Sequence, residues 1–323
     1  MKAILYHSYG SPDVLKYEEV ATPIPADNQV LIEVRAASLN PMDWHFMRGL
    51  PYLVRIVAGL PKPKFPGLGA DVAGKVVAIG AGVTRFKPGD EVFGVARGAL
   101  AEFACAAESQ LSERPHNVTF EQAASAPIAA LSALQSARDK GHLQSGQKVL
   151  VNGAAGGVGS FAVQIAKSFG AKVTGVCSTG NVDMLRSLGA DHVIDYTRED
   201  FTTAGQHYDL LLDCVGNRSL ADCKRVLNPA GICVAVGGST DPWMLRPLAR
   251  LFASAVLSRI GSQKFRSFLA RPKREDLVII GGLLQSGKVV PVIDRRYSLR
   301  DVPEAMRYLG QGHARGKIII TPP

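Results

Sequence analysis

In the first part of the chain, hydrophobic residues alternate with polar ones, and this pattern predicts short β-strands. Val30–Arg35 alternates with a period of two, and Asp71–Ile79 is a second strand-like run. Phe86–Gly94 joins a Pro-Gly turn to the start of another strand. Short strands between glycine and proline turns are typical of a partly open β-barrel. We therefore predict a β-rich domain over residues 1–125.

From about Ala126 the hydrophobic spacing changes to alternating helices and strands. Helical spacing predicts helices over residues 127–138, 160–169, 182–188 and 275–285. Short apolar runs predict strands over residues 148–152, 172–177, 192–195, 210–214 and 232–236. This alternation predicts an α/β domain with a doubly wound parallel sheet over residues 126–287. Strand-like runs at 289–293 and 317–321 predict that residues 288–323 return to complete the first domain.

Residues 148–167 contain an apolar strand, a glycine-rich turn and a helix, which is the context of a dinucleotide-binding fingerprint. The amino end of a helix favours phosphates through free N–H groups and the helix dipole. Gly156 and Gly157 let the backbone approach a pyrophosphate, and Gly159 lets the helix pack closely on the strand. Ala154 takes the first position of the usual glycine motif. The predicted cofactor contacts in this turn are Ala154, Ala155, Gly156, Gly157, Val158 and Gly159.

The 323 residues suffice for two domains with separate cores, and 46% hydrophobic residues is ordinary for a globular protein. No run of 18 uncharged apolar residues predicts a membrane span. The N-terminal residues lack the features of a signal peptide, so we expect a cytoplasmic protein. The five cysteines are scattered without a Cys-x-x-Cys pair, which predicts reduced thiols. We interpret Cys177 and Cys214 as small apolar packing residues beside the cofactor turn, with redox reactivity as the alternative.

The net charge of +9 is unevenly distributed. Eight Lys or Arg residues and no acid lie between Arg246 and Arg274, among apolar residues that suit an amphipathic helix. Such a stretch could contact an anionic membrane surface, a nucleic acid or an approaching anionic cofactor. We favour a solvated basic face over a packed helix, because no groove-reading motif accompanies the charge.

Six spaced motifs together resemble the medium-chain dehydrogenase/reductase superfamily, in its zinc-free quinone oxidoreductase branch. They are Asn40–Asp43, Gly69–Gly74, Phe86–Asp90, Gly153–Gly159, Leu188–Tyr196 and Gly316–Ile320. The resemblance covers nearly the whole chain. It implies a GroES-like catalytic domain, a Rossmann cofactor domain and a homodimer. The charge pattern and the lack of a spanning run predict no specific nucleic-acid partner and at most peripheral membrane contact.

The resemblance also implies that no metal takes part. Zinc alcohol dehydrogenases of this superfamily have a Cys in the segment that matches 40–43 and a His where this chain has Ala70. No cysteine precedes Cys105 here, and catalytic zinc needs three protein ligands. Without a Lewis acid, we expect hydride transfer from NADPH to an acceptor that is already electrophilic, a quinone or an α,β-unsaturated carbonyl.

The resemblance favours NADPH over NADH. Ser178 stands where an NAD enzyme of this superfamily has an acid for the ribose, and an acid there would repel a 2′-phosphate. Ser178, Thr179 and Asn181 offer small donors instead, and Tyr196 matches a tyrosine near the same phosphate. No cation is identified in this loop.

The remaining site residues also rest on the resemblance. Asn40 matches the zinc-ligand loop and is predicted to bond the acceptor or the cofactor; Asp43 is predicted to hold this loop through backbone N–H groups. His45 is a candidate proton donor, and Tyr52 a candidate donor to the acceptor carbonyl; a solvent-facing histidine and a packed rim aromatic are the alternatives. Further cofactor contacts are predicted at Cys214, Val236, Gly237, Ser239 and Lys317.

The apolar, proline-bounded segment 49–66 is predicted to line an acceptor site for an apolar molecule. Two other functions stay open. One is an enoyl or alkenal reductase with little quinone activity. The other is a weakly active NADPH-binding protein that uses its basic face on RNA or a membrane.

Overall fold

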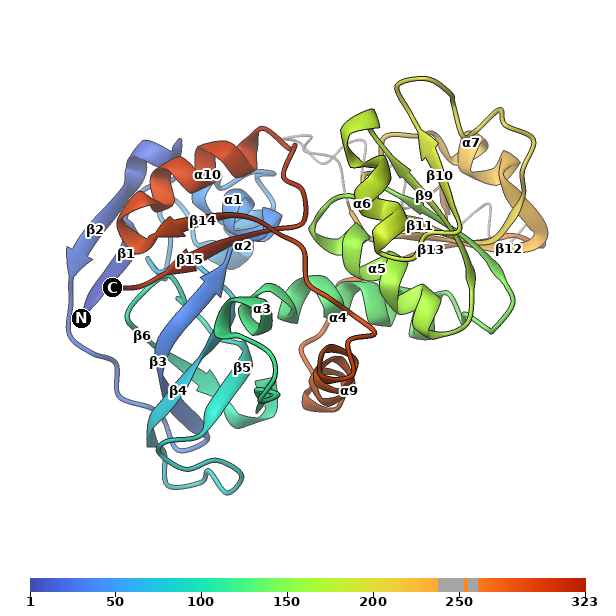
Figure 1. The fold of residues 1–323 in the computed structure, drawn as a ribbon. Coiled ribbons are helices and arrows are strands. Elements are labelled where there is room, and N and C mark those ends of the chain that lie inside the picture. The colour runs from blue at the N-terminus through green and yellow to red at the C-terminus, as the bar shows by residue number, and fades with distance from the viewer. Residues whose placement is uncertain (238–252, 255–260) are drawn as a thin grey trace. The chain divides into compact units, whose positions relative to one another are not determined.

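The computed structural model describes residues 1–237, 253–254 and 261–323. Ser239 lies outside the described residues, and so do residues 246–252 and 255–260 of the basic stretch 246–274. The end of this stretch is described, and the helix expected there is wrong, because Lys264–Ser267 form the edge strand β13 instead. The chain divides into two compact units (Figure 1). Unit 1 comprises Met1–Leu131, Arg271–Gly287 and Pro291–Pro323, and unit 2 comprises Ser132–Ala270 and Lys288–Val290.

Unit 1 is built on a mostly antiparallel sheet in the order β14-β15-β3-β4-β5-β7, with β6 paired to β3. The strands are β3 (Gln29–Ser38), β4 (Asp71–Ile79), β5 (Glu91–Val95), β6 (Phe103–Ala107), β7 (Leu111–Glu113), β14 (Ile293–Ser298) and β15 (Lys317–Thr321), and a separate ribbon pairs β1 (Lys2–Tyr6) with β2 (Leu15–Glu19). Alternating side chains of these strands form one hydrophobic core. The predicted β-rich domain is confirmed.

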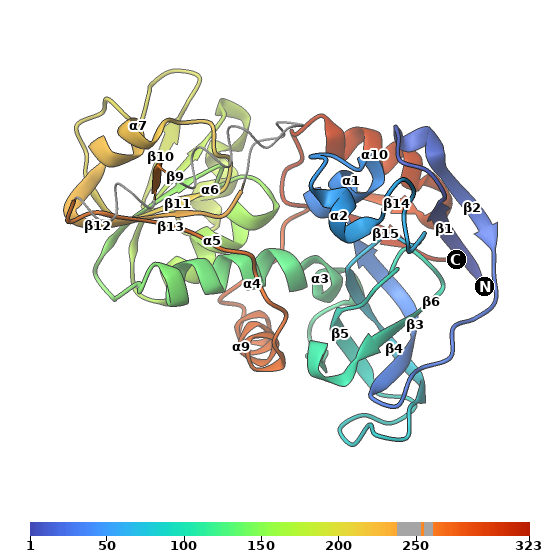
Figure 2. The ribbon, with the colours of Figure 1, turned by 180° about the vertical axis from the view of Figure 1, so that it is seen from behind.

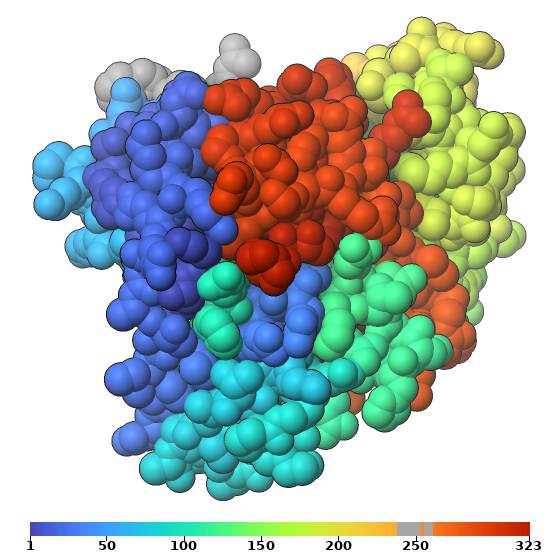
Figure 3. Space-filling view, turned by 60° about the vertical axis from the view of Figure 1, so that its left-hand side comes forward, coloured from blue at the N-terminus to red at the C-terminus, as the bar shows by residue number. Residues whose placement is uncertain are grey.

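The helices of unit 1 cover this sheet and its edges. They are α1 (Pro41–Arg48), α2 (Val54–Ala58), α3 (Phe120–Ser125), α9 (Arg274–Gln285) and α10 (Val302–Gly310), with short 3-10 turns at Pro12–Val14, Glu108–Gln110 and Leu299–Asp301. Figure 3 shows α10 in red beside the N-terminal strands in blue. An ion pair between Arg307 on α10 and Asp13 joins the two ends of the chain within this unit.

Unit 2 is a six-stranded parallel sheet in the order β10-β9-β8-β11-β12-β13. The strands are β8 (Lys148–Asn152), β9 (Lys172–Cys177), β10 (His192–Asp195), β11 (Tyr208–Asp213), β12 (Leu227–Ala235) and β13 (Lys264–Ser267). Counted from β8, this is the 3-2-1-4-5-6 order of a Rossmann fold. The doubly wound sheet is confirmed.

The helices of unit 2 lie on both faces of its sheet. They are α5 (Gly157–Ser168), α6 (Val182–Ser187) and α7 (Leu220–Arg225), with a π turn at Ser136–Lys140 and a 3-10 turn at Thr179–Asn181. In Figures 1 and 2, α5 and α6 cover one face and α7 the other. Right-handed crossovers require this, because the chain moves from β8 to β10 in one direction and from β11 to β13 in the other.

The units differ from the predicted domains at two places. The first boundary falls after Leu131, inside α4 (Pro127–Gln135), rather than at residue 125. Residues 271–287, with α9, belong to unit 1, although we predicted them in the Rossmann domain. The reason is packing: α9 contacts β7, and Asn117 donates to the Gln285 carbonyl at 2.8 Å.

The predicted strand at 289–293 is wrong. Val290 pairs instead with a side chain, since Gln164 on α5 accepts from its N–H at 2.7 Å and donates to its carbonyl at 3.0 Å. The strand β14 begins at Ile293 and lies at the edge of the sheet. Its sequence is polar, so the hydrophobic pattern did not predict it. None of the helices in the described part of the chain combines the length and hydrophobicity that a bilayer span requires.

Candidate functional site: a dinucleotide cradle and a buried polar cluster

The glycine turn follows β8 directly and leads into α5. Gly153 has a φ of +79°, a left-handed conformation that favours glycine, and a Cβ there would lie 2.4 Å from Val215. At Gly159 a Cβ would lie 2.1 Å from the Gly153 carbonyl oxygen. These two glycines are therefore required by the packing of the chain on itself, as predicted for Gly159.

Gly156 is different. Its φ of −81° and ψ of 179° are open to any residue, and a Cβ would meet only the Gly153 oxygen, at 3.5 Å. It is the N-cap of α5, with no capping side chain and no acid in the first turn. The chain itself does not require glycine at this position. The absence of a side chain leaves the free N–H groups of the helix open to a ligand, and a pyrophosphate suits such a position.

The turn lies where the order of the parallel strands reverses, between β8 and β11. Ligands of such sheets bind at the carboxyl ends of these strands. Cys214 follows β11, and its N–H donates to the Asn152 carbonyl at 3.0 Å. A Cβ on Gly237 would lie 2.0 Å from the Cys214 oxygen, so the loop after β12 runs against the loop after β11. The predicted residues Cys214, Val236 and Gly237 thus share this edge of the sheet, which agrees with a cofactor site.

Both cysteines near the turn behave as apolar thiols. Burial raises the pKa of Cys177 to about 11, and the Asp195 carboxylate acts in the same direction. Burial also raises the pKa of Cys214 well above its usual range. Because the thiolate is the reactive form, neither position suits redox chemistry.

The predicted ribose loop lies at the carboxyl end of β9. Asn181 donates to the Ser178 hydroxyl at 3.1 Å, and its own Oδ1 is buried without a partner among the described residues. The Thr179 hydroxyl donates to Asp195 at 2.5 Å. Thr179 is therefore already engaged, whereas Ser178 and Asn181 line the loop. Tyr196 is half exposed beside them.

Two residues of this loop were missed by sequence reasoning. Asp195 ends β10, and the hydrogen bond from Thr179 is the main cause that lowers its pKa. Arg198 comes within 3.5 Å of that carboxylate. This contact brings a cation to the loop, in which the sequence identified none. A basic residue two positions after Tyr196 was the available signal.

In unit 1 a fully buried carboxylate organises the segment that was expected to hold the acceptor. Asp71 opens β4, and its Oδ2 accepts from Ser38 at 2.7 Å and from Asn40 at 2.8 Å. Its Oδ1 accepts from the N–H of Ile128 at 2.8 Å. Sequence reasoning did not identify this role, although an acid at the start of an apolar strand was the signal.

Lys317 completes this cluster at the start of β15. Only 3% of it is exposed, and its ammonium donates to Asn40 Oδ1 at 2.6 Å, to the Leu39 carbonyl at 3.0 Å and to Asp71 at 3.1 Å. An ammonium has three hydrogens, so these contacts use all of them. We predicted that Asn40 bonds the acceptor or cofactor and that Lys317 contacts the cofactor. The structure instead holds these two side chains against each other.

Helix α1 carries the remaining polar candidates. The Asp43 carboxylate accepts from the N–H groups of Asn40 at 2.8 Å and Gly69 at 3.0 Å, which is the predicted loop-holding role. Burial raises the pKa of Asp43 to about 6, with a further upward effect from the Asp71 carboxylate. His45 Nδ1 lies 2.9 Å from the Leu50 carbonyl. A carbonyl only accepts, so Nδ1 carries the proton and Nε2 of the neutral ring can only accept.

An apolar surface follows α1. Tyr52 is 43% exposed, and its ring stacks 5.1 Å from the Arg55 guanidinium carbon. The exposed apolar residues of this segment are Leu53, Ile56, Val57, Leu60 and Phe65. We call Tyr52–Phe65 the apolar segment. Within the described residues no group of three His, Cys, Asp or Glu side chains is placed to hold a metal.

Comparison with known proteins identifies the family. The family model of the alcohol dehydrogenase GroES-like domain matches residues 26–116, and that of the zinc-binding dehydrogenases matches 188–320. The chain is 35% identical to the chloroplast envelope quinone oxidoreductase homolog of Arabidopsis thaliana, over 100% of this chain and 98% of that protein. The chain belongs to the medium-chain dehydrogenase/reductase superfamily. Within it, the match places this dehydrogenase/reductase in the quinone oxidoreductase branch.

The chain is also similar to two further oxidoreductases, one by sequence and one by structure. The 2-methylene-furan-3-one reductase of Solanum lycopersicum is 38% identical, over 100% of this chain and 79% of that protein. The crystal structure of the Escherichia coli quinone oxidoreductase complexed with NADPH matches with a TM-score of 0.83 and 27% identity, over 100% of both chains. The likeness spans both units of this dehydrogenase/reductase.

Proposed function

We propose that this chain transfers hydride from NADPH to a quinone or to an α,β-unsaturated carbonyl. The observation that carries the proposal is Gly156 at the N-cap of α5, a glycine that the packing of the chain does not require and that leaves the helix N–H groups open to a phosphate. The names of two relatives, a quinone oxidoreductase homolog and a reductase of an enone, support the two acceptor classes. The bound dinucleotide supplies the hydride.

The residues of unit 2 bind and orient the cofactor in this proposal. The first N–H groups of α5 hold the pyrophosphate. Ser178, Asn181 and Tyr196 surround the ribose end, where the unpartnered Asn181 Oδ1 can accept from a ribose hydroxyl. Arg198 faces the 2′-phosphate, a charge that NADH lacks, and this contact favours NADPH.

We further propose that the reaction uses no zinc. The position of the zinc-binding histidine is Ala70, and the neighbouring Asp71 already accepts from an ammonium at 3.1 Å. A second cation beside Lys317 would meet like-charge repulsion at a buried site. Such an enzyme cannot use a metal to polarise an alcohol, which favours acceptors that are electrophilic on their own.

In unit 1, the exposed side chains of the apolar segment suit an apolar acceptor. Tyr52 is proposed to donate to its carbonyl oxygen. The proton-donor role of His45 stays a prediction, and it requires the doubly protonated ring, since Nδ1 is bonded to Leu50. Asn40 acts by holding the Asp71–Lys317 cluster, which fixes the start of α1.

The decisive experiment follows the oxidation of NADPH and, separately, NADH by purified protein with a panel of quinones and enones. The zinc content of the same sample is measured by mass spectrometry. NADPH-selective turnover without zinc supports the proposal, and the ratio of quinone to enone activity separates its two acceptor classes. Tight NADPH binding without turnover would favour a binding protein, and activity-linked zinc would exclude the mechanism.

A homodimer and a cytoplasmic location, both expected from the sequence, belong to the same proposal. Sedimentation of the purified protein tests the first, and cell fractionation tests the second.

A further inference from the structure

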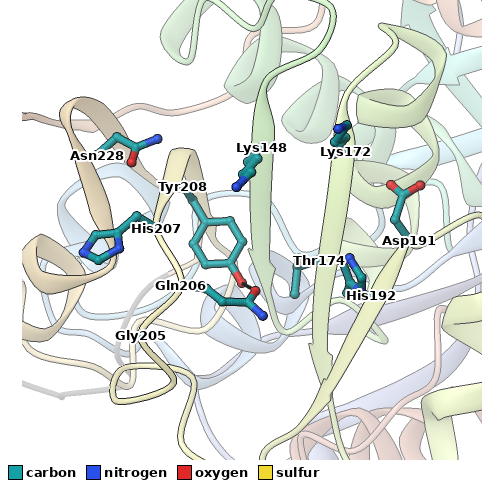
Figure 4. Close-up of a pocket in the computed structure, with 10 residues that line it drawn as sticks. All are labelled: Lys148, Lys172, Thr174, Asp191, His192, Gly205, Gln206, His207, Tyr208 and Asn228. Atoms are coloured by element: carbon teal, nitrogen blue, oxygen red, sulfur yellow. Dashed lines mark hydrogen bonds between the residues drawn. The ribbon is translucent and has the colours of Figure 1, made fainter.

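The sheet of unit 2 carries a second hollow, at the edge where its strands begin (Figure 4). This cavity has a volume of about 690 Å³. It lies among the amino ends of β8 to β11, with Asn228 of β12 beside them. From Lys148 to Asn152 the strand β8 rises about 13 Å, so the hollow, which we call the amino-edge cavity, is separate from the glycine turn.

Two lysines stand side by side on its wall. Lys148 and Lys172 are the first residues of adjacent parallel strands and are in register, about 5 Å apart. Residues in register project from the same face of a sheet. Like charges in this arrangement repel each other. Neither ammonium forms an ion pair with any residue that the structure describes, so their charge is available to a ligand.

Two histidines add to this basic wall. His192 is in register with Thr174, which follows Lys172 by two residues, so all three side chains lie on one face of the sheet. His207 reaches the cavity from the segment before β11. Four basic side chains thus line the cavity from four separate segments of the chain.

The nearby carboxylates do not neutralise them. Asp191 is the one acid among the described lining residues, and it accepts from Lys167 at 2.8 and 2.9 Å and from the Val173 N–H at 2.6 Å. Asp209, which is next to Lys148 but not among the lining residues, accepts from the N–H of Lys148 at 2.8 Å and from Asn228 at 2.7 Å. Both carboxylates hold backbone or neighbouring groups rather than the two lysine ammoniums.

Neutral donors complete the wall. The Tyr208 hydroxyl is buried and donates to Gln206 Oε1 at 2.9 Å. This bond occupies the acceptor of the Gln206 amide and leaves its NH₂ group as a donor. Figure 4 shows Gln206 below the Tyr208 ring, with Thr174 and His192 to its right and Lys148 above. The wall therefore offers mainly N–H donors, and phosphoryl oxygens are pure acceptors.

We propose that the amino-edge cavity binds a small phosphate compound with at least two negative charges, such as a diphosphate. Lys148 and Lys172 take the charge, and His192 and Gln206 add directional hydrogen bonds. The ligand binds together with the dinucleotide, since the two sites lie at opposite edges of the sheet. This site does not depend on the proposed oxidoreductase reaction.

Isothermal titration of the full chain with inorganic pyrophosphate, with NADP⁺ at saturation, tests the proposal. We expect one pyrophosphate per chain and at least tenfold weaker binding for Lys148→Gln/Lys172→Gln. The matched control Lys16→Gln/Lys224→Gln removes the same charge from exposed lysines outside the cavity, and its affinity should stay within twofold. Circular dichroism verifies folding, and Lys172→Gln alone serves if the double variant does not fold.

Two further titrations test where the probe binds and which class of ligand the cavity takes. Gly156→Val, which fills the dinucleotide cradle, should leave pyrophosphate binding unchanged when measured without NADP⁺. Loss of binding in Gly156→Val but not in the double lysine variant would overturn the proposal, because the probe would then lie at α5. If citrate bound as tightly as pyrophosphate, the proposal that the ligand is a phosphate compound would be overturned. If both double variants lost the same affinity, the effect would come from net charge and the proposed site would be overturned.

Discussion

Lys317 and Asp71 form an ion pair that is almost completely removed from solvent, with side-chain exposures of 3% and 0%. The two residues are 246 positions apart in the chain, on β15 and β4, and Asn40 bridges them. A buried charge that loses its partner destabilises a protein strongly, whereas removal of both charges costs less.

Lys317→Met should therefore lower the free energy of unfolding by about 3–5 kcal/mol, since Asp71 stays buried without its cation. Lys317→Met/Asp71→Asn should recover part of this loss. Urea unfolding followed by circular dichroism measures both. Lys2→Met, which breaks the exposed pair with Glu19, is the control and should stay near wild type. A Lys317 variant as stable as this control would contradict the buried-pair argument.

Asp43 gives the stability of unit 1 a pH dependence. Its pKa is about 6 in the folded chain against an ordinary value of 3.8, so the folded state binds the proton more tightly. Its contribution is complete below about pH 4 and is lost as the pH rises through 6. The free energy of unfolding of the wild type minus that of Asp43→Asn should fall from pH 4.5 to pH 7. Urea unfolding of both proteins at each pH measures this difference. A difference that grows with pH would show that the carboxylate is stabilised by its two N–H donors instead.

The glycines of the turn should separate ligand binding from folding. Gly156→Val should change the free energy of unfolding by no more than about 1 kcal/mol, because the chain leaves room for a side chain there. NADPH affinity, measured by fluorescence titration, should fall at least tenfold. Gly159→Ala is the counterpart: its Cβ would press on the Gly153 carbonyl, so thermal unfolding should occur at lower temperature. Normal NADPH binding by Gly156→Val would remove the main support for the proposed function.

Arg198 should discriminate between the two nicotinamide cofactors. Loss of its charge removes a charge-assisted contact to the 2′-phosphate and leaves NADH contacts unchanged. We expect Arg198→Ala to raise the KM for NADPH about tenfold with little effect on NADH. Arg186→Ala removes an exposed arginine of α6 that pairs with Asp183, and serves as the control. Equal changes for both cofactors would place Arg198 outside the phosphate site.

The thiols beside the glycine turn should be unreactive in the folded protein. The raised pKa values of Cys177 and Cys214 keep both protonated at pH 8. Labelling with a thiol reagent at that pH should be at least about 100-fold slower at these two positions than in urea. Mass spectrometry of the digested protein assigns each site. Rapid labelling of Cys214 in the native protein would revive a redox role.

The first four strands of unit 2, β8 to β11, could be predicted closely because each contains a short apolar run between turns. The strand β13 was missed, because its sequence is largely polar and lies in the stretch expected to be helical. Lys172–Cys177 and His192–Asp195 have the predicted bounds, and the glycine turn has the predicted place after β8. Periodicity could not predict that Val290 lies outside a strand, because its backbone N–H bonds to the side chain of Gln164 on α5. It also could not assign α9 to unit 1, because an apolar helix face does not say which core it joins.

The polar cluster shows a second limit of sequence reasoning. Asn40 and Lys317 were each identified through the resemblance, but their contact joins residues 277 positions apart. Asp71, which holds both, was identified only as the first residue of a predicted strand. Charge pairing across such a distance depends on strand order, here the insertion of β15 beside β3, and strand order is not written in local spacing.

That same insertion has a consequence for synthesis. On the ribosome, all of unit 2 is made before β15, so the α/β half can fold while unit 1 waits for its last strand. Until residue 317 leaves the ribosome, Asp71 has no cation, and the central sheet keeps an open edge at β3. Unit 1 thus cannot be completed until residues 317–321 are made, and a variant that lacks residues 317–323 would be left with a half-built sheet around an uncompensated charge.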